Sequence, residues 1–126
     1  MPQKHEFDRV LQSVSDGKEP VDYGIMDDDN TVLFIKSGNG GSHRGYEDKY
    51  LRLADRVNQE HGYTVICASN PINGDKTLDR DMRQVKNYAG LRGFDGYHVL
   101  YMGFSDGRGS GLVMVRSTPR SGAWFS

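Results

Sequence analysis

The chain has 126 residues, with 16 basic and 17 acidic side chains, a formal charge of -1 at pH 7 and 36% hydrophobic residues. This length fits one domain, and the mean hydropathy of -0.68 predicts a small core. The near-neutral charge, without a cluster of Lys and Arg, argues against nucleic acid or an acidic membrane as partners. No apolar run approaches the roughly 18 residues that span a bilayer, and the charged start lacks the apolar core of a signal peptide. We therefore expect a cytoplasmic protein with no membrane partner.

The first elements in chain order are predicted to be a short helix and an edge strand. Apolar residues in 7–14 recur at helical spacing, and Ser15-Asp16-Gly17 would end that helix. Apolar residues alternate through 21–25, as in a strand with one exposed face. The acidic segment 27–30 lacks the glycine and the distal glutamate of a calcium loop, so we expect a solvated turn there.

Three apolar runs that alternate with two helical patterns follow, and they predict an α/β fold. Strands alternating with helices of this length are typical of a mostly parallel sheet with right-handed crossovers and flanking helices. Cys67 lies within one of the apolar runs, so it is expected to be a buried thiol. The strands are expected at 32–35, 63–67 and 97–102, and the helices at 46–57, ended by Gly62, and at 78–89, capped by Thr77.

The composition changes at Gly107. Residues 107–126 contain three arginines but no Asp, Glu, Lys or His, and their glycines are poor helix formers. Only Leu112 to Val115 has the pattern of a regular element. We therefore expect one domain over 1–106 and an atypical Gly/Ser/Arg-rich tail over 107–126.

The strongest chemical motif is G-x-S-x-G, which here reads Gly103-Phe104-Ser105-Asp106-Gly107 and follows a predicted strand. Small residues two before and two after the serine let the backbone turn sharply, so that the serine side chain projects alone. In such an elbow Ser105 is the nucleophile. The backbone N–H of Asp106 is then one of two donors to the oxyanion that forms during acyl transfer.

A glycine-rich loop, 37–42, follows the strand at 32–35 and leads into the helix that starts near Tyr46. Together, this loop, that helix and the serine elbow resemble the N-terminal half of an α/β-hydrolase, from about Thr31 to Gly107. The resemblance implies a partial α/β-hydrolase fold and a serine hydrolase that acts on a small ester or other acyl substrate. It also implies that the N–H of Asn39 is the second oxyanion donor, while Gly38, Gly40 and Gly41 keep the loop close to the substrate. Family members usually carry His-Gly at the start of this loop, where this chain has Ser37-Gly38.

The catalytic triad expected from the resemblance is incomplete in this chain. The family order is serine, then acid, then histidine, but the only acid after Ser105 is its neighbour Asp106, and no histidine follows. His43 is the one histidine expected near the site, as a substitute base. Without a base the serine is a weak nucleophile, so we expect an impaired catalyst, truncated or frame-shifted after about Gly107. Strand 97–102 would then be an exposed edge that pairs with a second copy.

Two other functions remain open at this stage. The first is a non-catalytic or self-associating half-fold, which would use the exposed edge to bind a partner strand. The second is a nucleotide-binding module built on 107–111, although Leu112 stands where a dinucleotide loop has its third glycine. We expect no cofactor and no metal, because no histidine pair has ligand spacing on one element.

Overall fold

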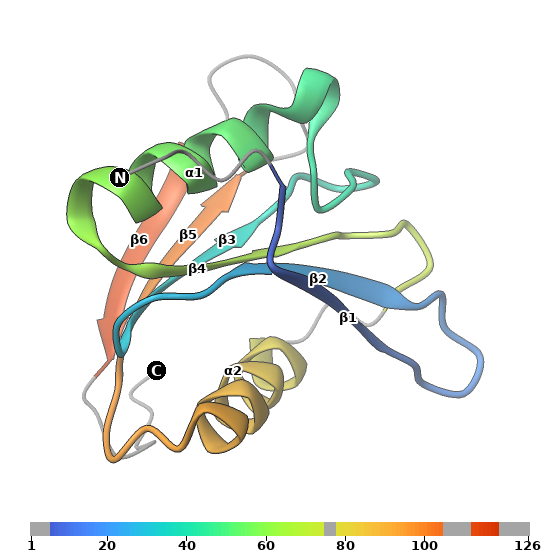
Figure 1. Cartoon of the computed structure of the whole chain (residues 1–126). Helices are drawn as coiled ribbons and strands as arrows, with labels where there is room; N and C mark the ends of the chain where they lie inside the picture. Colours follow the sequence, from blue (N-terminus) through green and yellow to red (C-terminus); the bar gives the residue numbers. More distant parts are fainter. Residues whose placement is uncertain (1–5, 75–77, 105–111, 119–126) are drawn as a thin grey trace.

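The computed structural model describes residues 6–74, 78–104 and 112–118 of the chain (Figure 1). In these residues six strands form one sheet in the order β1-β2-β4-β3-β5-β6. The strands are β1 (Arg9–Ser13), β2 (Val21–Met26), β3 (Thr31–Lys36), β4 (Thr64–Ala68), β5 (His98–Phe104) and β6 (Leu112–Thr118). The helices are α1 (Lys49–His61), preceded by the 3-10 turn η1 (Tyr46–Asp48), and α2 (Leu78–Arg92).

The expectation of a mostly parallel sheet with flanking helices, as in a partial α/β-hydrolase fold, is wrong. The pairs β1·β2, β2·β4 and β5·β6 are antiparallel, and only β3·β4 and β3·β5 are parallel. Parallel strands need a crossover of a dozen residues or more, which α1 and α2 supply. The links 14–20, 27–30 and 105–111 are shorter than that. The result is a strand-rich mixed sheet with one helix on each face (Figure 1).

The helix expected over 7–14 is also wrong, because this segment contains β1. Its helical spacing of apolar residues does not produce a buried face, since Val10 and Val14 are 52% and 69% exposed. Instead Leu11 pairs with Tyr23 of β2, and the ring of Phe7 lies where a side chain on Gly24 would be. Pairing with β2 therefore outweighs the local pattern.

Two predictions about sheet edges change as a consequence. The strand predicted over 21–25 exists as β2, but it is internal because β1 covers its outer side. β5 is not an exposed edge either, because β6 pairs with it from Val99 to Phe104. The edges of the sheet are β1 and β6. Self-association through an exposed β5 therefore loses its structural basis.

The other predicted strands and helices are found close to their predicted ranges, and they build a core on both faces of the sheet. The predicted helix cap, Thr77, lies outside the described residues. Alternate residues of the central strands pack under α1 or under α2, so β3 is buried on both sides, as its continuous apolar run predicts. α1 ends at Gly62 in the left-handed conformation, and Cys67 is buried beneath α1. Met82, Val85 and Ala89 of α2 face the opposite side of the sheet.

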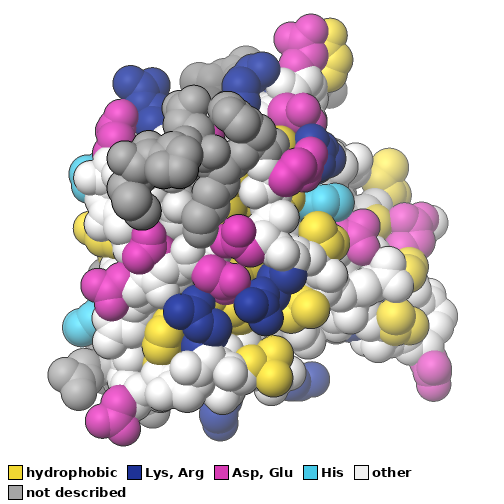
Figure 2. Space-filling model, viewed as in Figure 1, with side chains coloured by type: hydrophobic (Ala, Val, Ile, Leu, Met, Phe, Trp, Pro, Cys, Tyr) yellow, Lys and Arg dark blue, Asp and Glu magenta, His cyan; other side chains and the backbone are white. Residues whose placement is uncertain are grey.

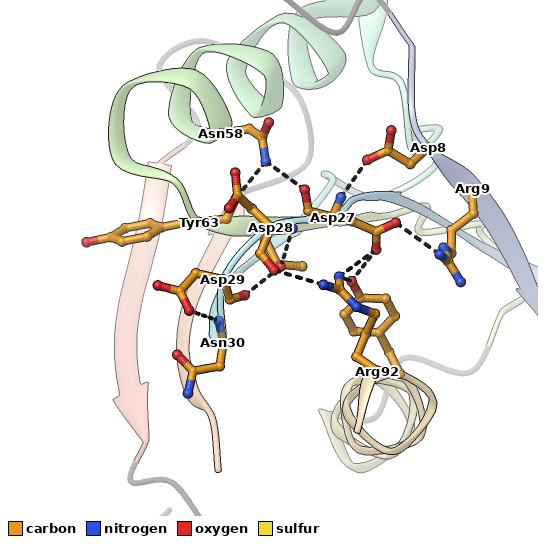
Figure 3. Close-up of polar contacts among 11 residues, drawn as sticks. Asp8, Arg9, Asp27, Asp28, Asp29, Asn30, Asn58, Tyr63 and Arg92 are labelled. Carbon is orange, nitrogen blue, oxygen red and sulfur yellow. Dashed lines mark hydrogen bonds and ion pairs between the residues drawn. The ribbon is translucent and has the colours of Figure 1, made fainter. Parts of the chain in front are cut away.

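The acidic segment 27–30 is a turn that joins β2 to β3 (Figure 3). Asp27 accepts a hydrogen bond from Arg9 at 3.0 Å and one from the Tyr88 hydroxyl, and it forms an ion pair with Arg92 at 3.1 Å. Burial alone would raise the pKa of Asp27, but the Tyr88 hydrogen bond and the two arginines lower it overall. Asp28 and Asp29 are exposed. The turn thus attaches β1 and α2 to the same end of the sheet.

Acidic and basic side chains are interspersed on the face shown in Figure 2, and they form no separate acidic or basic patch there. Such a surface lacks the single-sign field that steers a highly charged partner. In the described part of the chain, neither helix has the length and apolar content needed to cross a bilayer.

Candidate functional site

The two strands that follow β3 in the chain, β4 and β5, lie on opposite sides of β3 in the sheet. α1 carries the chain from β3 to β4 on one side, and α2 returns it across β3 to β5 on the other side (Figure 1). The register pairs Lys36 with Gly103, so the carboxyl ends of β3 and β5 are level. Ligands of open α/β sheets bind beyond the carboxyl ends of the strands at such a reversal. This point is therefore the structural candidate for a site.

The glycine-rich loop after β3 lies at this point and is braced by Asn70, which follows β4. The N–H of Asn70 donates to the carbonyl of Gly41 at 2.9 Å, and its carbonyl accepts from the N–H of Gly40 at 2.6 Å. Its side-chain amide donates to the carbonyl of Ser37 at 3.1 Å. One residue of the neighbouring strand end thus holds both ends of the loop in place.

Gly41 is at a position that only glycine fits. A Cβ at this position would lie 2.9 Å from the Ser37 hydroxyl oxygen and 3.0 Å from the carbonyl oxygen of Gly38. The Ser37 hydroxyl donates to the carbonyl of Gly41 at 3.0 Å, and the N–H of Gly41 donates to the carbonyl of Gly38 at 2.8 Å. The loop folds back on itself at this glycine, which explains its composition.

A hollow of about 180 Å³ lies between the loop and the start of α1. Tyr50 is one of its walls, and the ring of Tyr50 lies 5.2 Å from the ring of Phe104 at the end of β5. The residues around the hollow are Gly38, Asn39, Gly40, Gly41, Gly45, Tyr46, Lys49 and Tyr50. The loop predicted from the sequence therefore lines a cavity whose wall residue Tyr50 also contacts Phe104, the last described residue before Ser105.

The predicted serine elbow is only partly visible in the structure. Gly103 is in β5 beside the ring of Tyr101, whereas Ser105, Asp106 and Gly107 lie outside the described residues, as does the proposed nucleotide loop 107–111. Asn39 is exposed at the rim of the hollow, which is compatible with its predicted role as an oxyanion donor. The N–H groups of Gly40 and Gly41 are occupied within the loop and its brace. These two glycines shape the loop, and their closeness to a substrate stays a prediction.

His43, the predicted substitute base, lies near the glycine loop but does not line the hollow. Its Nδ1 is 4.0 Å from a carboxylate oxygen of Asp22, and its ring lies 5.6 Å from that of Phe7. Burial lowers the pKa of His43 below its usual value, with the charge of Asp22 acting in the opposite sense. The lowered pKa favours the neutral imidazole, which is the form a base requires, but the ring faces Asp22 on β2.

Sequence reasoning missed the buried polar cluster beneath the loop. The ammonium of Lys36 donates to the carbonyl of Ser69 at 2.9 Å and lies 3.4 Å from the carboxylate of Asp81 on α2. The Tyr23 hydroxyl donates to the same carboxylate at 3.1 Å. Burial raises the pKa of Asp81, and the charge of Lys36 opposes that rise. The sequence signal for this cluster is Lys36, a charged residue directly after the apolar run 32–35.

The start of α1 also differs from the prediction. The helix predicted over 46–57 begins at Lys49, whereas Tyr46 is in η1 and 79% exposed. Glu47 and Asp48 have positive φ angles of 51° and 60°, a conformation that is unfavourable outside glycine. Arg44 holds this turn by a 2.9 Å hydrogen bond to Asp48. The turn places Tyr46 at the rim of the hollow.

No family model, curated protein or solved structure matches this chain. Among residues 6–74, 78–104 and 112–118, no group of three or more His, Cys, Asp or Glu is placed to hold a metal ion.

Proposed function

We propose that the chain is a serine hydrolase-like protein in which Ser105 takes the acyl group of a small ester bound in the hollow. The observation that carries this proposal is the contact between Tyr50, a wall of the hollow, and Phe104, the residue before Ser105. The placement of the glycine loop between β3 and the next helix also supports it, because acyl-transfer enzymes take an oxyanion donor from a loop in this position.

The reaction proceeds by acyl transfer to a serine that lacks a strong base. The hydroxyl oxygen of Ser105 forms a bond to the substrate carbonyl carbon and loses its proton to water. The bond from that carbon to the leaving group breaks, and the leaving group departs as an alcohol or phenol. Water then cleaves the acyl-serine. Because His43 faces Asp22 on β2, the chain depends on stabilisation of the oxyanion, and turnover is slow.

The test is acetylation by an activated ester. The whole chain is incubated with p-nitrophenyl acetate, and the modified residue is located by peptide mass spectrometry. One acetyl group on Ser105 is expected. Ser105→Ala should abolish the modification, and the matched variant Ser15→Ala, between β1 and β2 and away from the hollow, should retain it. Modification spread over several serines or lysines, and unchanged by Ser105→Ala, would refute the proposal.

A second candidate, ligand binding without turnover, is favoured by the position of His43 away from the hollow. It predicts that a small ligand binds while Ser105 stays unmodified. Thermal shift with short carboxylic acids, measured beside the acetylation assay, separates the two functions.

A further inference from the structure

Lys49 is the only charged residue among the described residues that line the hollow. Its ammonium lies 5.1 Å from the centre of the Tyr50 ring and 5.9 Å from that of Phe104. Tyr50 lines the hollow, and Phe104, at the end of β5, contacts the ring of Tyr50. The cation is thus held over an aromatic surface, at the same place where the proposed acyl group would lie.

Two carboxylates near this ammonium are paired with another cation. Glu6 and Asp48 both bind the guanidinium of Arg44, at 2.7 Å and 2.9 Å. No ion pair of Lys49 is found within the described ranges. A positive charge is therefore available to a ligand on this side of the hollow.

The backbone at the start of α1 is not an alternative anion site. The N–H of Lys49 donates to the carbonyl of Tyr46, and those of Tyr50 and Leu51 donate to the carbonyl of Arg44 at 2.9 Å and 3.3 Å. The N–H of Gly45 donates to the Ser42 hydroxyl. These amides are occupied, so an anion in the hollow would be recognised by the side chain of Lys49.

The size of the hollow limits the length of an anionic ligand that could bind there. Its volume of about 180 Å³ is below the roughly 300–1,000 Å³ of sites for drug-sized ligands, so a short chain fits and a long lipid chain does not. The aromatic wall suits the methylene groups of such a chain.

We infer that the acyl group taken by this site is short and carries a carboxylate, which the ammonium of Lys49 binds. This inference rests on the proposed function, because it names the substrate class of the same hollow. Monoesters of short dicarboxylic acids are the corresponding substrates. The carboxylate pairs with Lys49, and the ester carbonyl faces the loop and the end of β5.

Binding is tested with monomethyl succinate and methyl butyrate, which have the same number of carbon atoms and differ in a carboxylate against a methyl group, by NMR titration of the Ser105→Ala chain. Monomethyl succinate should bind more tightly, and Lys49→Met should weaken its binding about tenfold, the loss expected for one charge-assisted contact. Lys49→Arg should retain part of the preference. Lys86→Met is the matched control, since Lys86 is exposed on α2, on the opposite face of the sheet. Equal binding of the charged and the neutral ester, or no effect of Lys49→Met, would overturn the inference.

Reactivity is tested separately with mono-p-nitrophenyl succinate and p-nitrophenyl butyrate. Faster acylation of Ser105 by the succinate ester, lost in Lys49→Met, supports the inference. Equal rates with the two esters overturn it while leaving the proposed function intact. Lys49-dependent binding of monomethyl succinate without acylation of Ser105 overturns the proposed function and supports the anion site.

Discussion

The buried ion pair between Lys36 and Asp81 ties the end of β3 to α2, directly beneath the glycine loop. Both side chains are buried, with 9% and 2% of their surface exposed. Lys36→Met keeps a long apolar side chain but removes the cation that faces the carboxylate. Removing one partner of a buried pair costs about 3–5 kcal/mol, because the other charge stays buried. We expect a loss of that size in the free energy of unfolding at pH 7.

The pH dependence of that loss follows from the raised pKa of Asp81. A carboxyl with a higher pKa in the folded state binds its proton more tightly when folded, so its contribution to stability falls as pH rises through the unfolded and then the folded pKa. Lys36→Met raises the folded pKa further. The deficit of the variant should therefore be smaller at pH 5 than at pH 7.

Urea denaturation of the wild type, Lys36→Met and Lys36→Met/Asp81→Asn at both pH values provides the assay. The double variant should be more stable than the single variant, because the amide that replaces the carboxylate carries no charge and its oxygen still accepts from the Tyr23 hydroxyl. A single-variant loss below about 1 kcal/mol, or a double variant less stable than the single one, would refute this reasoning.

Three further changes test other parts of the structure. Gly41→Ala should cost about 1–3 kcal/mol, because its Cβ meets Ser37, and it should also slow Ser105 acylation; unchanged melting and acylation would contradict the account of the loop. Gly90→Ala, an exposed helical position with open space around it, should instead stabilise by up to about 1 kcal/mol in the same melting experiment. The pKa of His43 is lowered in the folded state, so stability should fall as pH drops through about 6.5, and His43→Gln should flatten this fall in urea titrations between pH 5 and 7. An equally steep fall in that variant would assign the effect to other groups.

The central part of the fold could be predicted from the sequence because its patterns are strong and local. The run at 32–35 is continuous and became the doubly buried β3, and Gly62 ended α1 where a left-handed cap was expected. The segment 7–14 was mispredicted because its apolar spacing fits a helix, whereas the partner that decides its structure, β2, comes later in the chain. The pairing of β5 with β6 depends likewise on a long-range partner.

The candidate site was predicted in part for similar reasons. The glycine loop could be found because tight backbone contacts, as at Gly41, require glycine. The brace from Asn70 and the pair beneath it could not be predicted, because they join residues that are distant in the sequence. His43 was expected at the site because of its place in the loop, but its side chain points toward β2, which the sequence does not reveal.

The most direct test of the central claim is the rate at which Ser105 reacts with a fluorophosphonate in the folded chain and in urea. A serine activated by its surroundings must react faster when folded, because an unfolded chain offers neither the loop nor the hollow. The account predicts faster labelling of Ser105 in the folded chain, with the exposed Ser42 as the internal reference. A folded chain in which Ser105 reacts no faster than in urea, and no faster than Ser42, would contradict it.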